Sequence, residues 1–297
     1  MFGITRILCP VDFSDFSRHA LESAVTIARQ KQAAVTVLSV LPPAQTLYPA
    51  LGVGAYVPYI YTPEDLQRFQ TALERFVATV EYPVTAVSVE AIVVDEILRQ
   101  AAELPADLIV MGTHGRSGFD RLLLGSVAER VLVKATCPVL TIPAKARLVA
   151  PISGQGFQNV LCPIDFSPSS LVALDYAREL AREGAKLAVL HVSEQLPAWQ
   201  LVPADGTGAP DDPLVVLQQA RDRVHRVVTV GLKGTCDVEE LAAQGDAGDE
   251  ILRVAGSRQV DLIVMGAHAG RAGLLGFGST THDVLRGATC PVMTFKA

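Results

Sequence analysis

The chain repeats itself, and this repeat constrains the fold more than any other feature of the 297 residues. Three segments of the first half return in the second half. They are ILCPVDFS at 7–14 (VLCPIDFS at 160–167), DLIVMG at 107–112 (unchanged at 261–266) and ATCPV at 135–139 (unchanged at 288–292). A repeat of about 150 residues has the size of a whole domain. The chain is therefore expected to hold two copies of one domain.

The two copies are predicted to occupy residues 1–146 and 158–297. The stretch between them, residues 147–157, contains a proline and two glycines and lacks periodic apolar residues. This composition is typical of a short linker.

Each copy alternates apolar segments of strand length with amphipathic helical segments. In the first copy, strands are predicted at 4–11, 34–41, 84–90, 108–111 and 139–143, and helices at 14–30, 63–80, 95–103 and 126–134. The fourth strand is apolar throughout, as expected of a parallel strand buried on both faces. The fold class is therefore α/β, with a doubly wound, Rossmann-like parallel sheet of five strands in each copy. Ligands of such sheets bind at the carboxyl ends of the strands, where the strand order reverses.

Composition excludes several classes of protein. The chain is 49% hydrophobic and 19% charged, which supports two ordinary cores, and its net charge of −6 argues against nucleic acid and anionic membranes as partners. Its apolar runs are too short to span a bilayer, and the start of the chain does not resemble a signal peptide. A cytoplasmic location is expected. Five cysteines without a Cys-x-x-Cys spacing argue against disulfides and a zinc site.

A glycine-rich loop follows the fourth strand of the first copy. Gly112 and Gly115 are followed by Gly125 and Ser126, in the pattern G-x2-G-x9-G-S. Glycines let the backbone leave the strand and approach a ligand without a Cβ in the way. The helix that begins here offers N–H groups and partial positive charge to a phosphate, and Ser126 is expected to cap it and to donate to a phosphate oxygen.

Asp12 ends the first strand, which neighbours the fourth strand in a doubly wound sheet. Its carboxylate is suited to accept hydrogen bonds from a sugar or from an adenine amine. The alternative is that Asp12 only helps Ser14 to cap the first helix. His114 is expected either to contact phosphate or ribose or to lie in a solvent-exposed turn. Arg116 is expected either to lie over the phosphates or to be exposed to water.

These motifs resemble those of the universal stress protein family, and the resemblance covers nearly all of both copies. It rests on Cys9 to Asp12, the strand before Gly112, the glycine loop and Thr136 to Val139. The resemblance implies a fold related to that of the adenine-nucleotide alpha hydrolases and dimerisation through the last strand. In one subclass it also implies binding of ATP with Mg2+ or Mn2+.

The resemblance implies a site in the first copy. Asp12 and the backbone of Val40 would hold adenine and ribose. The expected binding residues are Pro10, Asp12, Val40, Met111, Gly112, His114, Gly115, Arg116, Gly125, Ser126 and Val127.

The second copy departs from the pattern, since Ala269 stands where the first copy has Gly115 and the loop reaches Gly278 one residue earlier. A Cβ there is costly if the backbone needs positive φ or close approach to phosphate, although Gly270 is adjacent. Nucleotide binding by this copy is left open. Its candidate residues are Asp165, Val192, Gly266, His268, Gly278, Ser279 and Thr280.

The segment 42–62 is rich in proline, glycine and tyrosine. It is interpreted as a lid, a partner surface or a disordered loop, because long irregular insertions are often functional.

Three functions compete. The first is an ATP-binding stress or signalling module with an unknown protein partner, the second a slow ATP hydrolase, and the third an interaction scaffold without nucleotide. The absence of a G-x4-G-K-[ST] loop leaves little support for hydrolysis. Fusion of two copies suggests a pseudo-dimer within one chain. The whole chain is expected either to remain a monomer or to form a homodimer.

Overall fold

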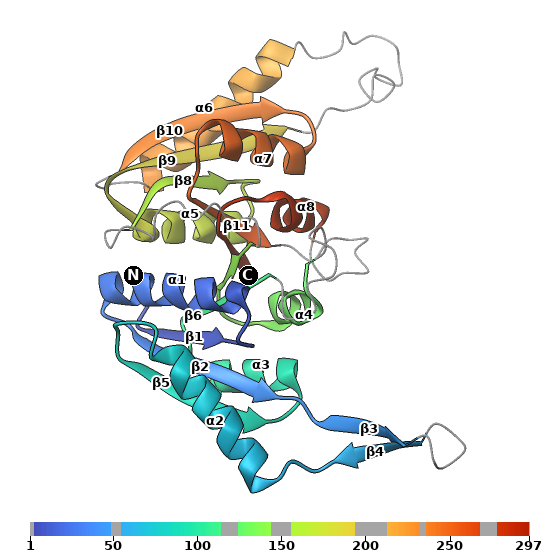
Figure 1. Cartoon of the computed structure of the whole chain (residues 1–297). Coiled ribbons are helices and arrows are strands. Elements are labelled where there is room, and N and C mark those ends of the chain that lie inside the picture. Colours follow the sequence, from blue (N-terminus) through green and yellow to red (C-terminus); the bar gives the residue numbers. More distant parts are fainter. Residues whose placement is uncertain are drawn as a thin grey trace. The chain divides into compact units, whose positions relative to one another are not determined.

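The computed structural model describes residues 3–48, 55–113, 124–143, 156–193, 213–231, 236–267 and 278–296. The chain divides into two compact units, residues 1–142 and 143–297 (Figure 1). The exact bounds of the linker stay a prediction, because residues 144–155 lie outside the described ranges.

The first unit is an α/β domain with one parallel sheet. Its strands are β1 (Arg6–Pro10), β2 (Ala34–Leu41), β5 (Val84–Glu90), β6 (Leu108–Gly112) and β7 (Val139–Ile142). Its helices are α1 (Asp15–Lys31), α2 (Pro63–Val77), α3 (Val93–Glu103) and α4 (Ser126–Lys134). The strands are parallel and lie in the order β5-β2-β1-β6-β7.

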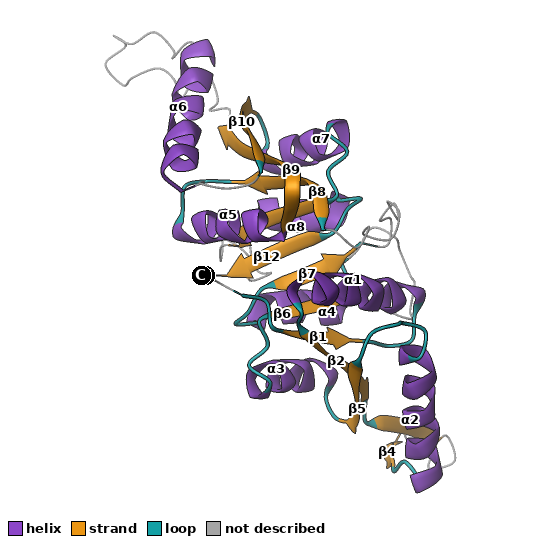
Figure 2. Cartoon of the chain, turned by 90° about the vertical axis from the view of Figure 1, so that its left-hand side faces the viewer, coloured by secondary structure: helices purple, strands orange, loops and turns teal. Residues whose placement is uncertain are grey.

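Burial explains why these segments form a sheet covered on both faces. Leu108, Ile109 and Val110 of β6 are fully buried, as are the apolar residues of α1 that recur at helical spacing, such as Leu21 and Ala28. Figure 2 shows α1 and α2 on one side of the sheet and α3 on the other. The strand order reverses between β1 and β6, so the carboxyl ends of these two strands mark the expected ligand site.

The second unit repeats this architecture. Its strands are β8 (Phe157–Pro163), β9 (Ala181–Ser193), β10 (Asp237–Gln244), β11 (Leu262–Ala267) and β12 (Val292–Lys296). Its helices are α5 (Pro168–Leu180), α6 (Pro213–Gly231), α7 (Ala247–Ser257) and α8 (Ser279–Gly287). The parallel order β10-β9-β8-β11-β12 matches that of the first unit. The prediction of two doubly wound five-stranded domains is confirmed.

The segment expected to be irregular holds a β-hairpin instead. Strands β3 (Ala44–Tyr48) and β4 (Ala55–Tyr59) pair antiparallel in a sheet of their own. The tyrosines and Val57 favour strands. The prediction missed this because it noted the tyrosines without weighing their preference for strands.

Helix boundaries differ slightly from those expected. Helix α2 begins after a capping box formed by Thr62 and Asp65 and ends at Val77, three residues early. Helix α3 begins at Val93, before the expected Asp95, and its N-cap residue Ile92 provides no side-chain hydrogen bond. No helix in the described ranges has the length and apolar character needed to cross a membrane.

Candidate functional site

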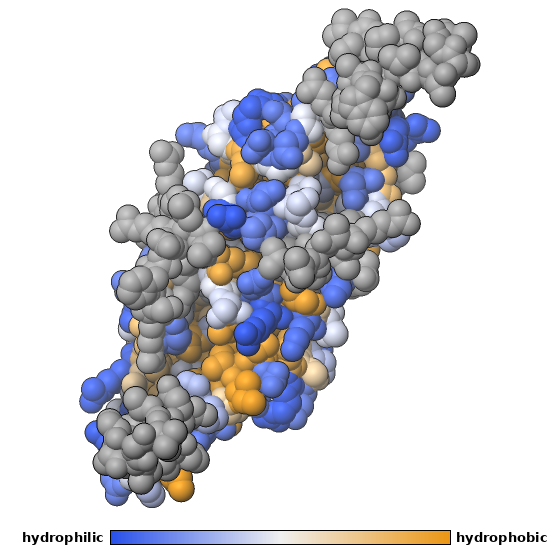
Figure 3. Space-filling view, turned by 90° about the vertical axis from the view of Figure 1, so that its right-hand side faces the viewer, coloured by the Kyte–Doolittle hydropathy of each residue, from blue (hydrophilic) through white to orange (hydrophobic). Residues whose placement is uncertain are grey.

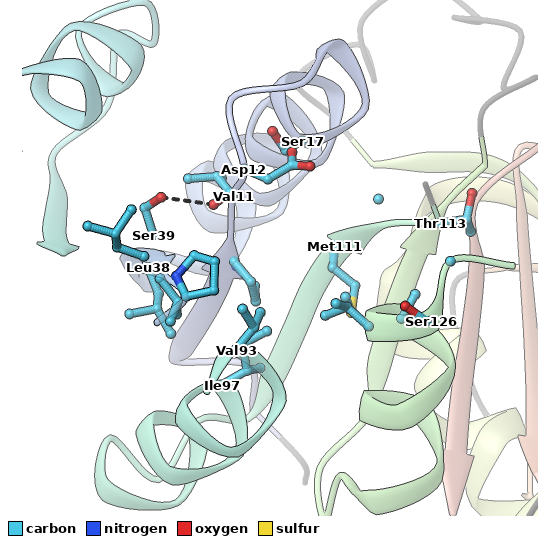
Figure 4. Close-up of a pocket in the computed structure, with 18 of the residues that line it drawn as sticks. Val11, Asp12, Ser17, Leu38, Ser39, Val93, Ile97, Met111, Thr113 and Ser126 are labelled. Carbon is cyan, nitrogen blue, oxygen red and sulfur yellow. Dashed lines mark hydrogen bonds between the residues drawn. The ribbon is translucent and has the colours of Figure 1, made fainter. Parts of the chain in front are cut away.

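A cavity of about 400 Å³ opens at the carboxyl ends of β1, β2 and β6, beside the first turn of α4 (Figure 4). It lies at the reversal of strand order, as expected for this topology. The sequence-predicted residues that line it are Pro10, Asp12, Val40, Met111, Gly112, Gly125, Ser126 and Val127. Residues up to 117 positions apart in the chain, Pro10 and Val127, therefore meet in one cavity. The remaining expected residues of this copy, His114, Gly115 and Arg116, lie outside the described ranges.

Asp12 is half-buried just after β1. Its Oδ1 accepts hydrogen bonds from the N–H of Ser14 at 3.1 Å and from the Ser14 hydroxyl at 2.6 Å. Ser14 is the N-cap residue of α1 and accepts from the N–H of Ser17. Asp12 thus supports the helix cap and also lines the cavity, so the two interpretations are not exclusive. A carboxylate has about four acceptor positions, more than the two hydrogen bonds from Ser14 use.

The N-terminus of α4 borders the cavity through Gly125 to Ala128. The expectation that Ser126 caps the helix is wrong, because Gly125 is the N-cap residue and Ser126 is the first helical residue. The N–H of Gly125 donates to the carbonyl of Thr113 at 2.7 Å, which holds this end of the helix beside β6. First-turn N–H groups have no partner within a helix, and they carry the positive end of its dipole. This end of the cavity is suited to an anion.

The opposite end of the cavity is apolar and was missed by the sequence analysis. Leu41, Phe69, Val93 and Ile97 line it, and hydrophobic surface gathers on this face of the first unit (Figure 3). Figure 4 shows Val93 and Ile97 projecting from one helix, α3. In the sequence, the spacing of Val93 and Ile97 is typical of ordinary core residues. Only the packing of α2 and α3 on the sheet shows that they border a cavity.

Ser39 is a second residue that the sequence analysis missed. It is buried, with 1% of its surface exposed, and its hydroxyl donates to the carbonyl of Val11 at 3.1 Å. This hydrogen bond joins the ends of β1 and β2 at the cavity wall. A serine inside an apolar strand carried no signal in the sequence.

The second unit preserves part of the arrangement. Asp165 accepts hydrogen bonds from the N–H and hydroxyl of Ser167, as Asp12 does from Ser14, but Asp165 is exposed. Gly278 is the N-cap residue of α8, which begins with Ser279 and Thr280. Val192 lies near the end of β9, and His268 lies outside the described ranges.

Gly266 has a structural reason to be glycine. A Cβ on Gly266 would lie 2.7 Å from the backbone carbon of Ser169 and 2.7 Å from the backbone nitrogen of Ser170. Both atoms belong to the first turn of α5. The close passage of this helix excludes a side chain here, so Gly266 is not evidence for a ligand.

The repeat, the strand order and the cavity agree with comparisons to known proteins. A family model described as the universal stress protein family matches residues 3–143 and, separately, residues 156–296. The chain belongs to the universal stress protein family. It is a tandem member with two family domains, as predicted from the repeat.

Related universal stress proteins match one domain of the chain or more. One from Methanocaldococcus jannaschii is 36% identical over 141 residues, which cover 46% of this chain and 81% of the relative. One from Mycolicibacterium smegmatis is 27% identical and is aligned over 98% of this chain and 96% of its own length. The crystal structure of a universal stress protein from Archaeoglobus fulgidus covers 99% of this chain with a TM-score of 0.67 and 22% identity, which supports the fold alone.

Proposed function

We propose that the first domain binds ATP and that this universal stress protein acts as a nucleotide-dependent stress-response or signalling module. The observation that carries the proposal is the single cavity that brings Asp12, the end of β6 and the N-terminus of α4 together. It places a hydrogen-bond acceptor, an apolar wall and an anion-binding helix end around one space.

Each part of the cavity suits one part of the nucleotide. The Asp12 carboxylate accepts hydrogen bonds from ribose hydroxyls, and the backbone of Val40 pairs with the adenine edge. Apolar residues such as Val93 and Ile97 pack against the base. The first-turn N–H groups of α4, together with the Ser126 hydroxyl, donate to phosphate oxygens.

Mg2+ or Mn2+ is proposed to reach this site through the phosphates. The described residues contain no group of three or more His, Cys, Asp or Glu side chains that could hold a metal ion. Mg2+ commonly keeps several waters and binds through one or two carboxylates and substrate phosphates. Asp12 is the carboxylate of the cavity wall, and the nucleotide would supply the remaining oxygen ligands.

The tandem arrangement is proposed to form a pseudo-dimer, with β7 and β12 as the pairing strands. Single-domain relatives correspond to one half of this chain, so the fusion supplies two domains from one polypeptide. Pairing of the last strands would cover two sheet edges. We propose that the protein works in the cytoplasm, where ATP is abundant. An unknown protein partner is proposed to distinguish the nucleotide-bound form from the nucleotide-free form.

The test is titration of the full chain with ATP and Mg2+ by isothermal calorimetry. Asp12→Ala is expected to weaken binding at least 10-fold, because each hydrogen bond to a charged group contributes about 1.5–3 kcal/mol. Asp165→Ala is the matched control, since Asp165 makes the same contacts with its own serine in the other domain. It is expected to leave the affinity of the first domain unchanged.

Gly115→Ala tests the glycine loop after β6 and is also expected to weaken binding. Absence of ATP binding by the unmodified chain at millimolar nucleotide would reject the proposal and favour a scaffold without nucleotide. Equal effects of Asp12→Ala and Asp165→Ala would reject the assignment of the site to the first domain.

A further inference from the structure

The two domains differ at an equivalent position near the carboxyl ends of β2 and β9. Pro10 pairs with Leu38 in the first domain, and Pro163 pairs with Leu190 in the second. The next residue along each strand is Ser39 in the first domain and His191 in the second. The register of the two sheets therefore places an imidazole where the first domain has a hydroxyl.

The two side chains contact equivalent backbone carbonyls. The Ser39 hydroxyl donates to the carbonyl of Val11 at 3.1 Å, and Nδ1 of His191 lies 2.8 Å from the carbonyl of Ile164, the equivalent residue. Because a carbonyl only accepts, Nδ1 of His191 carries the proton in this contact. The hydrogen bond keeps the ring beside the end of β8.

Aromatic contacts hold the imidazole in place. The rings of His191 and Phe166 have centroids 4.5 Å apart and an interplanar angle of 48°. The guanidinium of Arg223, from α6, lies 4.0 Å from the centroid of the Phe166 ring. Such a cation–π contact adds about 0.5–1 kcal/mol at an exposed site. His191, Phe166 and Arg223 thus form one stack, called the His191 stack below.

In the first domain, by contrast, Ser39 lines an open cavity. Phe13 has the same left-handed backbone as Phe166, with φ of 67° against 63°. However, the Phe13 ring packs edge-on against Phe69 and Phe76 of α2, at 5.5 and 5.6 Å. Ser39 and Phe69 both line the cavity. A histidine in place of Ser39 would project its ring into that space.

We propose that the His191 stack fills the base-binding end of the second crevice, so that the chain holds one adenine nucleotide, in its first domain. The inference rests on the proposed function, because it assigns His191 as the residue that decides which crevice accepts the base. The short hydroxyl leaves space for adenine, and the stacked imidazole occupies that space.

A reciprocal exchange in the full chain tests this inference. The probe is ATP with Mg2+, and the measurement is the number of nucleotides bound per chain by calorimetry and equilibrium dialysis. The unmodified protein is expected to bind one. His191→Ser is expected to bind two, and Ser39→His is expected to weaken binding at the first site at least 10-fold.

A second variant guards against a simple folding defect. His191→Asn keeps an N–H donor for the carbonyl of Ile164 but removes the ring, and it is also expected to bind two nucleotides. Photo-crosslinking with 8-azido-ATP followed by peptide mapping identifies the occupied domain, and thermal melts confirm that each variant is folded.

The outcomes separate the two proposals. No binding to the unmodified chain rejects the proposed function and with it this inference. If the chain binds one nucleotide in the first domain and both His191→Ser and His191→Asn leave this number unchanged, the role of His191 is rejected. The proposed ATP binding by the first domain then still stands. Two nucleotides bound to the unmodified chain also reject the inference, while they leave ATP binding standing.

Discussion

Asp107 joins the start of β6 to the start of β1 and is the clearest single-residue determinant of the first sheet. Its Oδ2 accepts hydrogen bonds from the N–H of Thr5 at 2.8 Å, the hydroxyl of Thr5 at 2.6 Å and the N–H of Arg6 at 2.9 Å. Asp107→Ala leaves these donors without their acceptor and is expected to destabilise the domain by about 2 kcal/mol. Urea unfolding followed by circular dichroism measures this effect. An unchanged midpoint would contradict it.

The pH dependence of the isosteric variant Asp107→Asn isolates the charge. Burial raises the pKa of Asp107, but the hydrogen bonds from Thr5 and Arg6 outweigh burial and the pKa is lowered overall. A lowered pKa means that the charge stabilises the fold above the ordinary carboxyl pKa of about 3.9, and that this stabilisation is lost as the pH falls through the lowered value. The variant is therefore expected to be less stable at pH 7, with the difference shrinking below about pH 4. A difference that stays constant down to pH 2 would exclude the charge as its cause.

The start of helix α3 differs from that of α7, its equivalent. Ile92 caps α3 without a side-chain hydrogen bond and is 63% exposed, whereas the Asp246 carboxylate caps α7 by accepting from the N–H of Asp249 at 3.0 Å. The two cap backbones are nearly identical, with φ and ψ of −72° and 117° against −68° and 129°. Ile92→Asp is expected to raise the unfolding free energy by about 1 kcal/mol in urea denaturation. Asp246→Ile is the reverse control, and stabilisation by it would contradict the argument.

The two units of the whole molecule are expected to respond unequally to nucleotide. Bound ligand at 100 times its Kd raises the free energy of opening by about 2.7 kcal/mol, which slows hydrogen exchange through open states about 100-fold. With ATP and Mg2+, peptides over 8–18 and 124–134 should slow, while peptides over 161–171 and 279–287 should not. Mass spectrometry of the full chain measures this, with Asp12→Ala as the control. Equal slowing in both units would contradict the prediction.

The sequence motifs predicted the site where the residues themselves carry the chemistry. Asp12 and Gly125 were found because a carboxylate after one strand and a glycine before a helix have meaning in the linear sequence. Phe69 and Val93 were missed because their spacing reads as core, and the cavity beside them exists only after α2 and α3 pack. His191 was missed because its equivalence to Ser39 depends on the pairing register of β8 and β9.

The amino-acid sequence by itself determined the repeat, the alternation of strands and helices and the doubly wound topology. These follow from local periodicity and from the steric rules that connect parallel strands. The tertiary structure alone decided which side chains border the cavity and which side chains lie beside Phe166 in the second domain. Such contacts join segments far apart in the chain, and their geometry depends on packing across the sheet.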